Sequence, residues 1–261
     1  MAGPYDKQAK LYLEARPQYP SDWYSTLSAL TPCRATAWDV GTGNGQAALG
    51  VAEHYDQVIA TDISKGQLEL GIPHPRIRYL HTPASLSENE LVDLVGGEGS
   101  IDLVVVATAI HWFDIPMFYG VVRRVLRKPG GVIAVWGYSD VIGVNPEFDA
   151  LQIRYRESAM PFWSAGVEYI FEEYRNLPFP FRSVGLGEEG NPKRLSLTRE
   201  LSFGSFLDVL RSSSAAGSAR EKGVDLLPEE VVGGLEAAWG RPDLVRTVRY
   251  NVFMIAGKLE E

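Results

Sequence analysis

The sequence predicts an α/β fold with a mostly parallel central sheet and helices on both of its faces. Short apolar segments alternate with helical ones between about residues 31 and 139. One segment, Val104 to Val106, is an uninterrupted apolar run, which is typical of a strand buried on both faces of a parallel sheet. Residues 36–71 combine a strand, a glycine-rich loop, a helix and a second strand, the order of one βαβ unit.

The N-terminal segment, residues 1–30, is predicted to be helical. Apolar and aromatic residues, Tyr12 among them, recur in its first half at helical spacing. Pro17 and Pro20 end this helix, because proline lacks the N–H that an interior helical position needs. A second short helix is expected over 22–30.

The core that follows is predicted to alternate strands and helices. Strands are expected over residues 35–40, 57–62, 77–81, 101–108 and 131–136, and helices over 46–54 and 117–126. Two further helices begin at capping boxes, since Ser64 precedes Gln67 and Ser87 precedes Glu90 by three positions.

From about residue 140 to 243 the pattern changes to prolines, aromatic residues and longer irregular stretches, which predicts a cap on the core. Asn145 and Pro146 begin a helix there, as cap and first helical residue. Residues 177–181 contain two prolines, which exclude a regular helix or a central strand. Beyond them we expect a strand over 193–203, helices over 206–217 and 228–239, and an apolar, β-rich segment over 245–258.

The loop after the first core strand predicts a ligand site. Gly41, Gly43 and Gly45 allow the backbone to turn tightly and to approach a ligand closely. The helix that follows offers free N–H groups. Asp39, two positions earlier, would repel a pyrophosphate and attract the ammonium group of a methionine. The loop therefore indicates S-adenosylmethionine.

A dinucleotide is the alternative ligand, because Gly43, Gly45 and Ala48 also satisfy the pattern G-x-G-x-x-G/A. Asp62, at the end of the second strand, would accept hydrogen bonds from ribose hydroxyls in either cofactor class. Glycine spacing leaves both ligands open, and the charge of Asp39 favours S-adenosylmethionine.

Four motifs in the chain resemble those of class I methyltransferases. They read D-V-G-T-G-N-G-Q, A-T-D-I-S, I-D-L-V-V-V-A-T-A-I-H-W-F-D and V-L-R-K-P-G-G-V-I-A-V-W-G-Y. The segments Y-L-E-A-R-P-Q-Y-P and P-F-P-F-R-S-V-G-L resemble the trans-aconitate methyltransferase-like branch, which includes plant embryo-abundant proteins and belongs to methyltransferase type 11. The likeness extends over nearly the whole chain.

This resemblance implies a Rossmann-like sheet of seven strands whose last, antiparallel edge strand lies at 244–261. It implies a cofactor-binding core at 31–139, the segment 1–30 over the cofactor, and a substrate cap at 140–243 that includes a late core strand near 193–203. The residues expected to bind the cofactor are Asp39, Gly41, Gly43, Gly45, Gln46, Asp62, Ile63, Ala84 and Ala107. The expected reaction is methyl transfer from S-adenosylmethionine to a small molecule, most simply to a carboxylate.

Recognition of adenine is expected to depart from the family pattern. Many relatives carry an acid after the third strand, whereas this chain has Pro83 between Thr82 and Ala84. Proline offers neither an acidic oxygen nor an N–H. We therefore expect backbone groups near Ala84 and the side chain of Ile63 to contact the ring.

His111 and Trp112 are the catalytic candidates. They follow the fourth core strand at the edge of the sheet where open α/β folds bind ligands. A carboxylate acceptor, with a pKa of about 4, is ionised at neutral pH and needs no general base. An amine, phenol or heterocycle, the alternative acceptor, would more often need one, and His111 is best placed for that role.

The acceptor is expected to be held by cationic and aromatic side chains. Arg16 would bind a carboxylate through two hydrogen bonds, and Arg211 would be a second clamp. Relatives tend to have an aromatic residue where this chain has Ser213, which leaves the size of the acceptor site open. The acceptor-binding candidates are Tyr12, Arg16, Tyr19, Trp136, Tyr138, Trp163 and Arg211, and the aromatic ones among them also fit a packing role.

The composition of the chain argues against some classes of ligand and partner. The formal net charge of −8 argues against broad nucleic-acid binding, which needs a basic surface. Cys33 is the one cysteine, and the four histidines lack ligand spacing, so no metal is expected. The N-terminal residues lack the apolar core of a signal peptide, and the apolar runs are too short to span a membrane, so we expect a cytoplasmic protein. We expect it to be a monomer or a homodimer and to act on a small molecule.

Two hypotheses from other classes remain. The chain would bind S-adenosylmethionine without catalysis if it is a sensor or an interaction partner, and methyl transfer to no acceptor would then be detectable. A dehydrogenase would bind nicotinamide instead.

Overall fold

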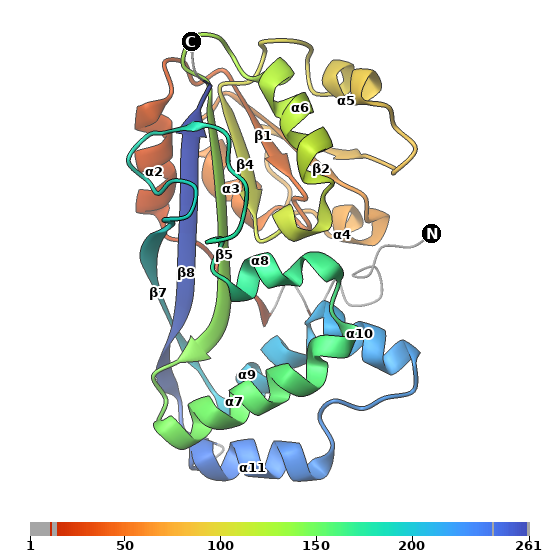
Figure 1. The fold of residues 1–261 in the computed structure, drawn as a ribbon, viewed down its shortest axis with the longest axis vertical. Coiled ribbons are helices and arrows are strands. Elements are labelled where there is room, and N and C mark those ends of the chain that lie inside the picture. The colour runs from red at the N-terminus through yellow and green to blue at the C-terminus, as the bar shows by residue number, and fades with distance from the viewer. Residues whose placement is uncertain (1–10, 12–14, 242, 260–261) are drawn as a thin grey trace.

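The computed structural model of the chain describes residues 11, 15–241 and 243–259. Its centre is an eight-stranded sheet in the order β3-β2-β1-β4-β5-β8-β6, with β7 also paired to β8 (Figure 1). The strands are β1 (Thr36–Val40), β2 (Gln57–Asp62), β3 (Ile77–His81), β4 (Leu103–Ala107), β5 (Val132–Ile142), β6 (Arg182–Ser183), β7 (Lys193–Leu201) and β8 (Arg246–Lys258). The predicted α/β class and mostly parallel sheet are confirmed. The helix expected before residue 17 falls largely outside the described residues.

The strand order reverses its direction at the centre of the sheet. β1 pairs in parallel with β2 on one side and with β4 on the other. The chain runs outward from β1 to β3 and then returns to build β4 and β5 on the opposite side. Ligands of open α/β sheets bind outside the carboxyl ends of the strands at such a switch point.

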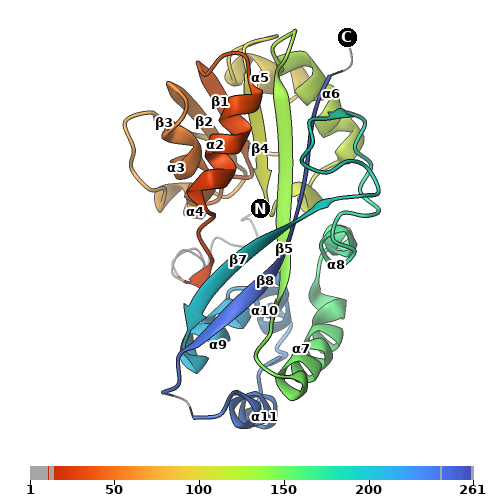
Figure 2. The same ribbon diagram turned by 90° about the vertical axis from the view of Figure 1, so that its left-hand side faces the viewer.

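Helices cover both faces of the sheet (Figures 1 and 2). Along β1, Ala37 belongs to the apolar cluster that includes α2 and α3, whereas Trp38 belongs to the cluster that includes α5 and α6. Val105 and Val104 of β4 divide in the same way. The alternation follows from the two-residue period of a strand. Both faces of the sheet are therefore buried against apolar side chains of the helices. The core helices are α2 (Ser21–Leu30), α3 (Gln46–Ala52), α4 (Lys65–Glu69), α5 (Glu88–Leu94) and α6 (Ile115–Val125), with the short η2 (Ile110–Trp112) before α6.

Three predicted helix starts are confirmed. Ser87 and Glu90 form both halves of a capping box, and the Asn145 side chain accepts a hydrogen bond of 2.9 Å from the Phe148 N–H. Ser64 accepts from the Gln67 N–H at 3.1 Å. Its own N–H donates to Asp62.

The C-terminal strand is antiparallel as expected, but it is not an edge strand. β8 pairs with β5 on one side and with β6 and β7 on the other. β5 also runs on to Ile142, six residues past the predicted end of that strand. The expectation of an edge was wrong because these long strands extend beyond the parallel core, and β7 pairs the backbone groups that an edge would expose (Figure 2).

The single helix expected over 206–217 is two helices. α9 (Phe203–Arg211) ends before Ser212, and α10 (Ser214–Glu221) begins after Ser213. The Ser213 side chain accepts a hydrogen bond of 3.1 Å from the Ala216 N–H, so it serves as an N-cap and divides the segment.

The cap lies beyond the carboxyl ends of β4 and β5 (Figure 1). It contains α7 (Pro146–Ala159), η3 (Met160–Phe162), η4 (Ala165–Val167), α8 (Glu168–Phe171), α9, α10 and α11 (Glu229–Trp239). α7 packs on α10 through an apolar cluster that includes Tyr155, Ala159 and Ala219. Among the described residues, no helix has both the length and the hydropathy that a membrane crossing requires.

Candidate active site

The glycines of the loop after β1 serve two purposes, close packing and access for a ligand. Gly41, Gly43 and Gly45 have φ values of +67°, +58° and +88°, which side chains rarely adopt. A Cβ on Gly41 would lie 2.6 Å from Ala109 Cβ, and one on Gly45 would lie 2.0 Å from Tyr79 Oη. A Cβ on Gly43 would meet nothing nearer than 3.8 Å. Gly41 and Gly45 are therefore required by packing, whereas Gly43 leaves an open face on which a ligand can lie.

Asp62 fixes the loop from the end of β2. One carboxylate oxygen accepts a hydrogen bond from the Gly43 N–H at 2.8 Å, and the other accepts from the Ser64 N–H at 2.8 Å. Asp62 therefore ties the end of β2 to the glycine loop, at the position where the sequence predicts contact with ribose hydroxyls.

Asp39 is fully buried in β1 beneath the same loop. One of its oxygens accepts a hydrogen bond of 2.5 Å from the Thr42 hydroxyl, while Oδ1 has no hydrogen-bond partner among the described residues. Burial raises the pKa of Asp39 to about 7, although interactions with the Thr42 hydroxyl and with the Ala48 backbone N–H oppose this shift. A cation near Oδ1 would restore the ionised form.

These residues fit S-adenosylmethionine. Asn44 Nδ2 and Gln67 Oε1 are buried polar atoms without partners among the described residues, as is Asp39 Oδ1. Buried polar groups are seldom left unpaired in folded proteins, so three together near one loop indicate a polar ligand. The residues that would hold S-adenosylmethionine here are Asp39, Gly43 with its open face, and Asp62.

Replacing Gly43 by alanine is expected to weaken S-adenosylmethionine binding at least about tenfold, because the new methyl group occupies the open face and adds strain at positive φ. Gly97 provides a matched control: its φ is +91°, and an added Cβ there meets nothing within 4 Å. Both variants should lose about 1 kcal/mol of stability, which urea denaturation measures, while calorimetric titration should show weaker binding only for Gly43→Ala. Equal affinity in the two variants would remove Gly43 from the site.

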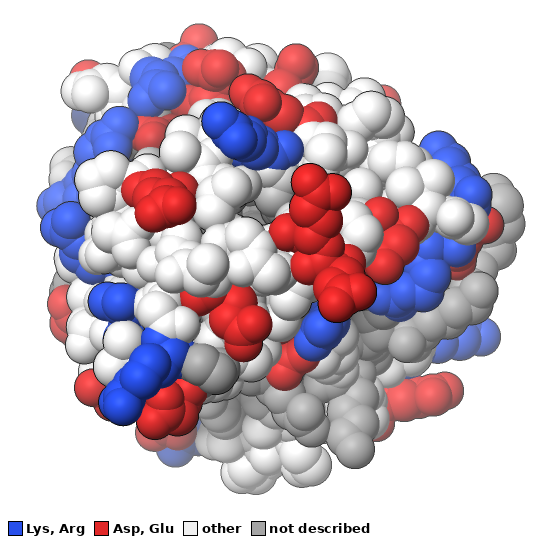
Figure 3. All heavy atoms as spheres, turned by 90° about the horizontal axis from the view of Figure 1, so that it is seen from below, with Lys and Arg blue, Asp and Glu red and all other residues white. Residues whose placement is uncertain are grey.

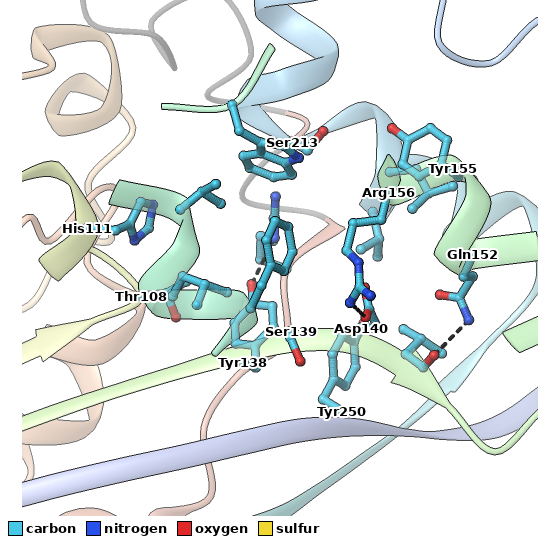
Figure 4. Close-up of a pocket in the computed structure, with 18 residues that line it drawn as sticks. Thr108, His111, Tyr138, Ser139, Asp140, Gln152, Tyr155, Arg156, Ser213 and Tyr250 are labelled. Atoms are coloured by element: carbon cyan, nitrogen blue, oxygen red, sulfur yellow. Dashed lines mark hydrogen bonds and ion pairs between the residues drawn. The ribbon is translucent and has the colours of Figure 1, made fainter. Parts of the chain in front are cut away.

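A cavity of about 120 Å³ lies where β4 and β5 meet the cap. Thr108 and His111, which follow β4, line one end, and residues of α7 line the other (Figure 4). Its polar and charged lining residues are Arg16, Thr108, His111, Tyr138, Ser139, Asp140, Gln152, Tyr155, Arg156, Trp163, Ser213 and Tyr250. Apolar side chains of α8 and α9 complete the wall.

A bulge in β5 shapes one wall of this cavity. Tyr138 pairs with Val252 and Val141 with Tyr250, so β5 has one more residue than β8 over this stretch. A regular strand points successive side chains to opposite faces, and a bulge breaks that alternation. Tyr138, Ser139 and Asp140 all line the cavity as a result (Figure 4).

Two arginines and one aspartate supply the formal charges of the lining. Arg16 donates hydrogen bonds to the Tyr138 hydroxyl at 3.1 Å and to the Ser212 carbonyl at 3.3 Å. Arg156 pairs with Asp140 at 2.5 Å and lies 5.1 Å from the centre of the Phe171 ring. With His111 neutral, the described lining has one more positive than negative charge.

His111 is 8% exposed, and its Nδ1 has no hydrogen-bond partner among the described residues. Burial, together with the positive charge of Arg16, lowers the pKa of His111 to about 4. The imidazole is therefore neutral at physiological pH. Such a group donates or accepts a hydrogen bond but is a weak base.

The structure brings several predicted acceptor residues together. Arg16, His111, Tyr138 and Trp163 line the cavity. Tyr19 is not among the lining residues, but it contacts one of them. Its hydroxyl lies 3.1 Å from that of Thr108, and the centre of its ring lies 5.4 Å from that of Trp136. Trp136 is fully buried in the core, where it supports Tyr19.

Other predicted residues lie elsewhere. Trp112 is 38% exposed and does not line the cavity, although its ring is 5.2 Å from that of His111. Tyr12 lies outside the described residues. On the cofactor side, Ile63 is 49% exposed and Ala84 is exposed. Gln46 is the first residue of α3, and Ala107 is the last of β4.

Arg211 requires a correction. It lies at the end of α9, 3.3 Å from Asp208, and lines a separate hollow that also includes Arg220. The break at Ser212 ends α9 at this residue, so the Arg211 side chain does not join Arg16. The second arginine of the cavity is Arg156.

Sequence reasoning missed Thr108, Asp140 and Arg156. Thr108 adopts a φ of +54°, which is uncommon for a β-branched residue and typical of functional positions. Its place directly after an apolar strand was the available signal. The polar pair Ser139-Asp140 after the apolar β5 was a second one, but nothing local to Arg156 distinguishes it from a surface residue of α7.

Comparisons with known proteins identify the family of the chain. A family model described as a methyltransferase domain matches residues 38–135. The chain is 30% identical to a Dictyostelium discoideum protein named as a methyltransferase, over 97% of this chain and 93% of that protein. A solved structure from Anaeromyxobacter dehalogenans, titled as a type II methyltransferase, has a TM-score of 0.75 and 34% identity over 94% of this chain and 99% of its own. The methyltransferase cfoB of Aspergillus candidus is 31% identical over 65% of this chain, which spans 59% of that protein.

Proposed function

Because this chain belongs to the class I S-adenosylmethionine-dependent methyltransferases, we propose that it methylates a carboxylate oxygen of a small organic acid. The observation that carries the proposal is the cavity between the ends of β4 and β5 and the cap, whose described lining has two arginines against one aspartate. The net positive lining favours an anionic acceptor. The assignment to the trans-aconitate methyltransferase-like branch is part of the same proposal and rests on the motifs of the sequence.

The size and the walls of the cavity support a small acceptor. Pockets for drug-sized ligands span roughly 300–1,000 Å³, against about 120 Å³ here. Aromatic rings and aliphatic side chains make up much of the wall, which suits the apolar body of a small acid. Trp163 Nε1 is buried without a hydrogen-bond partner among the described residues, and its N–H could donate a hydrogen bond to a carboxylate oxygen.

Positioning is the main work left to the protein. When bound, S-adenosylmethionine supplies an activated methyl group, which the ionised carboxylate takes up while S-adenosylhomocysteine leaves and a methyl ester forms. Arg16 would orient the carboxylate, and the buried aromatic wall would exclude water. Correct placement of two reacting groups can supply about 7–11 kcal/mol of a barrier. No proton has to be removed from an ionised carboxylate.

His111 disfavours the alternative acceptors. A group whose pKa is about 4 has little tendency to take a proton from an amine or a phenol at neutral pH. A neutral imidazole with an unpartnered Nδ1 suits a hydrogen bond to the bound acid instead.

The surface supports a small acceptor rather than a nucleic acid. On the face seen from below, basic side chains are interspersed with acidic ones rather than gathered in one patch (Figure 3). Together with the net charge of −8, this favours a partner that enters the cavity.

Release of S-adenosylhomocysteine from S-adenosylmethionine tests the proposal, with alkanoic acids of three to six carbons, primary amines and phenols as acceptors. We expect turnover with acids, methyl esters by mass spectrometry, and kcat/KM with acids that changes little between pH 5.5 and 8, since His111 titrates near pH 4. Turnover confined to amines or phenols, with a pH profile that His111→Ala abolishes, would contradict the carboxylate acceptor. Binding of S-adenosylmethionine without any turnover would favour a non-catalytic role.

A further inference from the structure

Thr108 lies between the glycine loop and the acceptor cavity. It directly follows β4, which ends at Ala107, and it lines the cavity (Figure 4). Its neighbour Ala109 packs closely on the glycine loop, since a Cβ on Gly41 would lie 2.6 Å from the Ala109 Cβ. This short segment after β4 therefore borders both the loop that would hold the methyl donor and the cavity that would hold the acceptor.

The backbone of Thr108 is strained. Its φ of +54° lies in the left-handed region, which is unfavourable for a residue whose side chain branches at Cβ. Strain of this kind persists where surrounding contacts enforce it, and it clusters at functional sites. Here the Thr108 N–H donates a hydrogen bond of 2.7 Å to the Trp136 carbonyl of β5, which holds the segment in place. Glycine would adopt this conformation more easily, so the threonine side chain lowers stability at this position.

The Thr108 hydroxyl is paired with one other hydroxyl. Its Oγ1 lies 3.1 Å from the Tyr19 Oη, and the Tyr19 ring packs edge-on against the Trp136 ring. Burial raises the pKa of Tyr19 well above its ordinary value, so the phenol keeps its proton. Two hydroxyls carry two protons, and the hydrogen bond between them uses one. Because Thr108 lines the cavity and Tyr19 does not, the proton of Thr108 serves a ligand there when Tyr19 donates to Oγ1.

Resting on the proposed function, we propose that Thr108 is a catalytic residue whose hydroxyl donates a hydrogen bond to the acceptor carboxylate, and that Tyr19 is the positioning residue that orients this hydroxyl. The contact goes to the carboxylate oxygen that is not methylated, which leaves the other oxygen to attack. The new C–O bond forms as the S–C bond breaks, the electron pair of that bond stays on sulfur, and no proton is transferred. Thr108 thus fixes the direction of attack.

The variants that test this role differ in single hydroxyl groups. Thr108→Val keeps the size and the branch of the side chain without its hydroxyl, and Thr108→Ser keeps the hydroxyl. Thr108→Gly also lacks the hydroxyl but relieves the backbone strain, so it should fold at least as stably as the wild type. Tyr19→Phe removes the partner hydroxyl and keeps the ring. For each variant, kcat and KM are measured with the carboxylic acid that the wild type methylates fastest, and calorimetry gives the affinity for S-adenosylmethionine.

Loss of the Thr108 hydroxyl should lower kcat at least about tenfold, with a smaller change in KM, because misorientation affects the reacting geometry more than total binding. Thr108→Ser should stay within about threefold of the wild type, and Tyr19→Phe should lose about 3- to 10-fold. The double variant Thr108→Val with Tyr19→Phe should be no slower than Thr108→Val alone, since Tyr19 acts through Thr108. Affinity for S-adenosylmethionine should not change in any of these variants.

The hydroxyl pair of Thr31 and Tyr55 is the matched control. The two oxygens lie 2.9 Å apart in a buried position, and neither residue lines the cavity. Thr31→Val and Tyr55→Phe should lower the melting temperature, because each removes a buried hydrogen bond, and should leave kcat unchanged. A fall in kcat that only follows a loss of stability would therefore appear in these variants too.

The outcomes separate this inference from the proposed function. Methylation of the acid by Thr108→Val at the wild-type rate overturns the inference and leaves the proposed function intact. An equal loss in Thr108→Ser and Thr108→Val also overturns it, because the hydroxyl would then have no part in the effect. Losses that multiply in the double variant exclude the positioning role of Tyr19. Turnover confined to amines or phenols contradicts the proposed function itself, and the carboxylate contact with it.

Discussion

Asparagine at position 39 is expected to stabilise the cofactor-free protein at pH 8 and to weaken S-adenosylmethionine binding about 10- to 100-fold. Both effects have one origin, the fully buried carboxylate whose Oδ1 has no hydrogen-bond partner among the described residues. Ionising Asp39 in the folded protein is unfavourable because burial raises its pKa to about 7. Removing the charge relieves that penalty, but it also removes the group that attracts a cationic ligand.

The direction of the pH effect follows from the shift. Between about pH 4 and pH 7 the folded protein retains a proton on Asp39 that the unfolded chain has lost, so stability declines as the pH rises through this window. A shift of about three pH units corresponds to about 4 kcal/mol at most, fully present above pH 7. Asp39→Asn should therefore raise the melting temperature more at pH 8 than at pH 5, by about 2–4 °C for each kcal/mol regained.

Asp102 supplies the matched control for this prediction. It is also fully buried, but it accepts hydrogen bonds from the Ala35 and Thr36 N–H groups and pairs with Arg127. The same substitution there should destabilise the protein by about 1–3 kcal/mol, since it removes the buried charge that accepts these hydrogen bonds and pairs with the half-exposed Arg127. Thermal unfolding with and without S-adenosylmethionine measures both effects. Unchanged cofactor affinity in Asp39→Asn would show that Asp39 does not contact the ligand.

Replacing Arg16 by alanine is expected to lower kcat/KM for a carboxylate acceptor about 100-fold and to leave the dissociation constant of S-adenosylmethionine within about threefold. Hydrogen bonds to a charged group contribute about 1.5–3 kcal/mol each, and a factor of ten corresponds to 1.4 kcal/mol. Arg16 lines the acceptor cavity beside His111 and Tyr138. Its loss should therefore be felt by the acceptor.

Arg211→Ala is the control for Arg16→Ala, because Arg211 lies outside the cavity at the end of α9. Steady-state kinetics with acceptor and cofactor varied separately distinguish the two variants. Arg16→Lys should recover only part of the loss, since an ammonium group cannot reproduce the planar two-point geometry of a guanidinium. An acceptor kcat/KM that is the same in Arg16→Ala as in the wild type would exclude Arg16 as the clamp.

Binding of an anionic acceptor should also raise the pKa of His111. The positive charge of Arg16 contributes to the low pKa of about 4, and a bound carboxylate would offset that charge. The protonation of His111 is therefore coupled to binding of the acceptor through the charge of Arg16.

The sequence by itself determined the βαβ unit that carries the glycine loop. Asp39, the glycines at 41, 43 and 45, and Asp62 lie within one βαβ unit, where strand, loop and helix follow one another along the chain. Local conformational rules act over such short separations, so alternation of apolar residues and glycine spacing were enough to identify the unit. The capping residues Ser87 and Asn145 marked helix starts for the same reason.

The tertiary structure alone brought together the residues of the cavity between the sheet and the cap. Arg16, Asp140 and Arg156 come from the N-terminal segment, a bulge in β5 and a cap helix, and they meet only when the chain has folded. A solvent-facing arginine and a cavity-lining one look alike in sequence, so the sequence does not distinguish Arg211, which lies outside the cavity, from Arg156, which lines it. The choice between them depends on where Ser213 divides two helices and on one additional residue in a strand. These small local differences decide which side chains line the cavity, and they do so through contacts between residues far apart in the chain. Periodicity and spacing in the sequence do not encode such contacts.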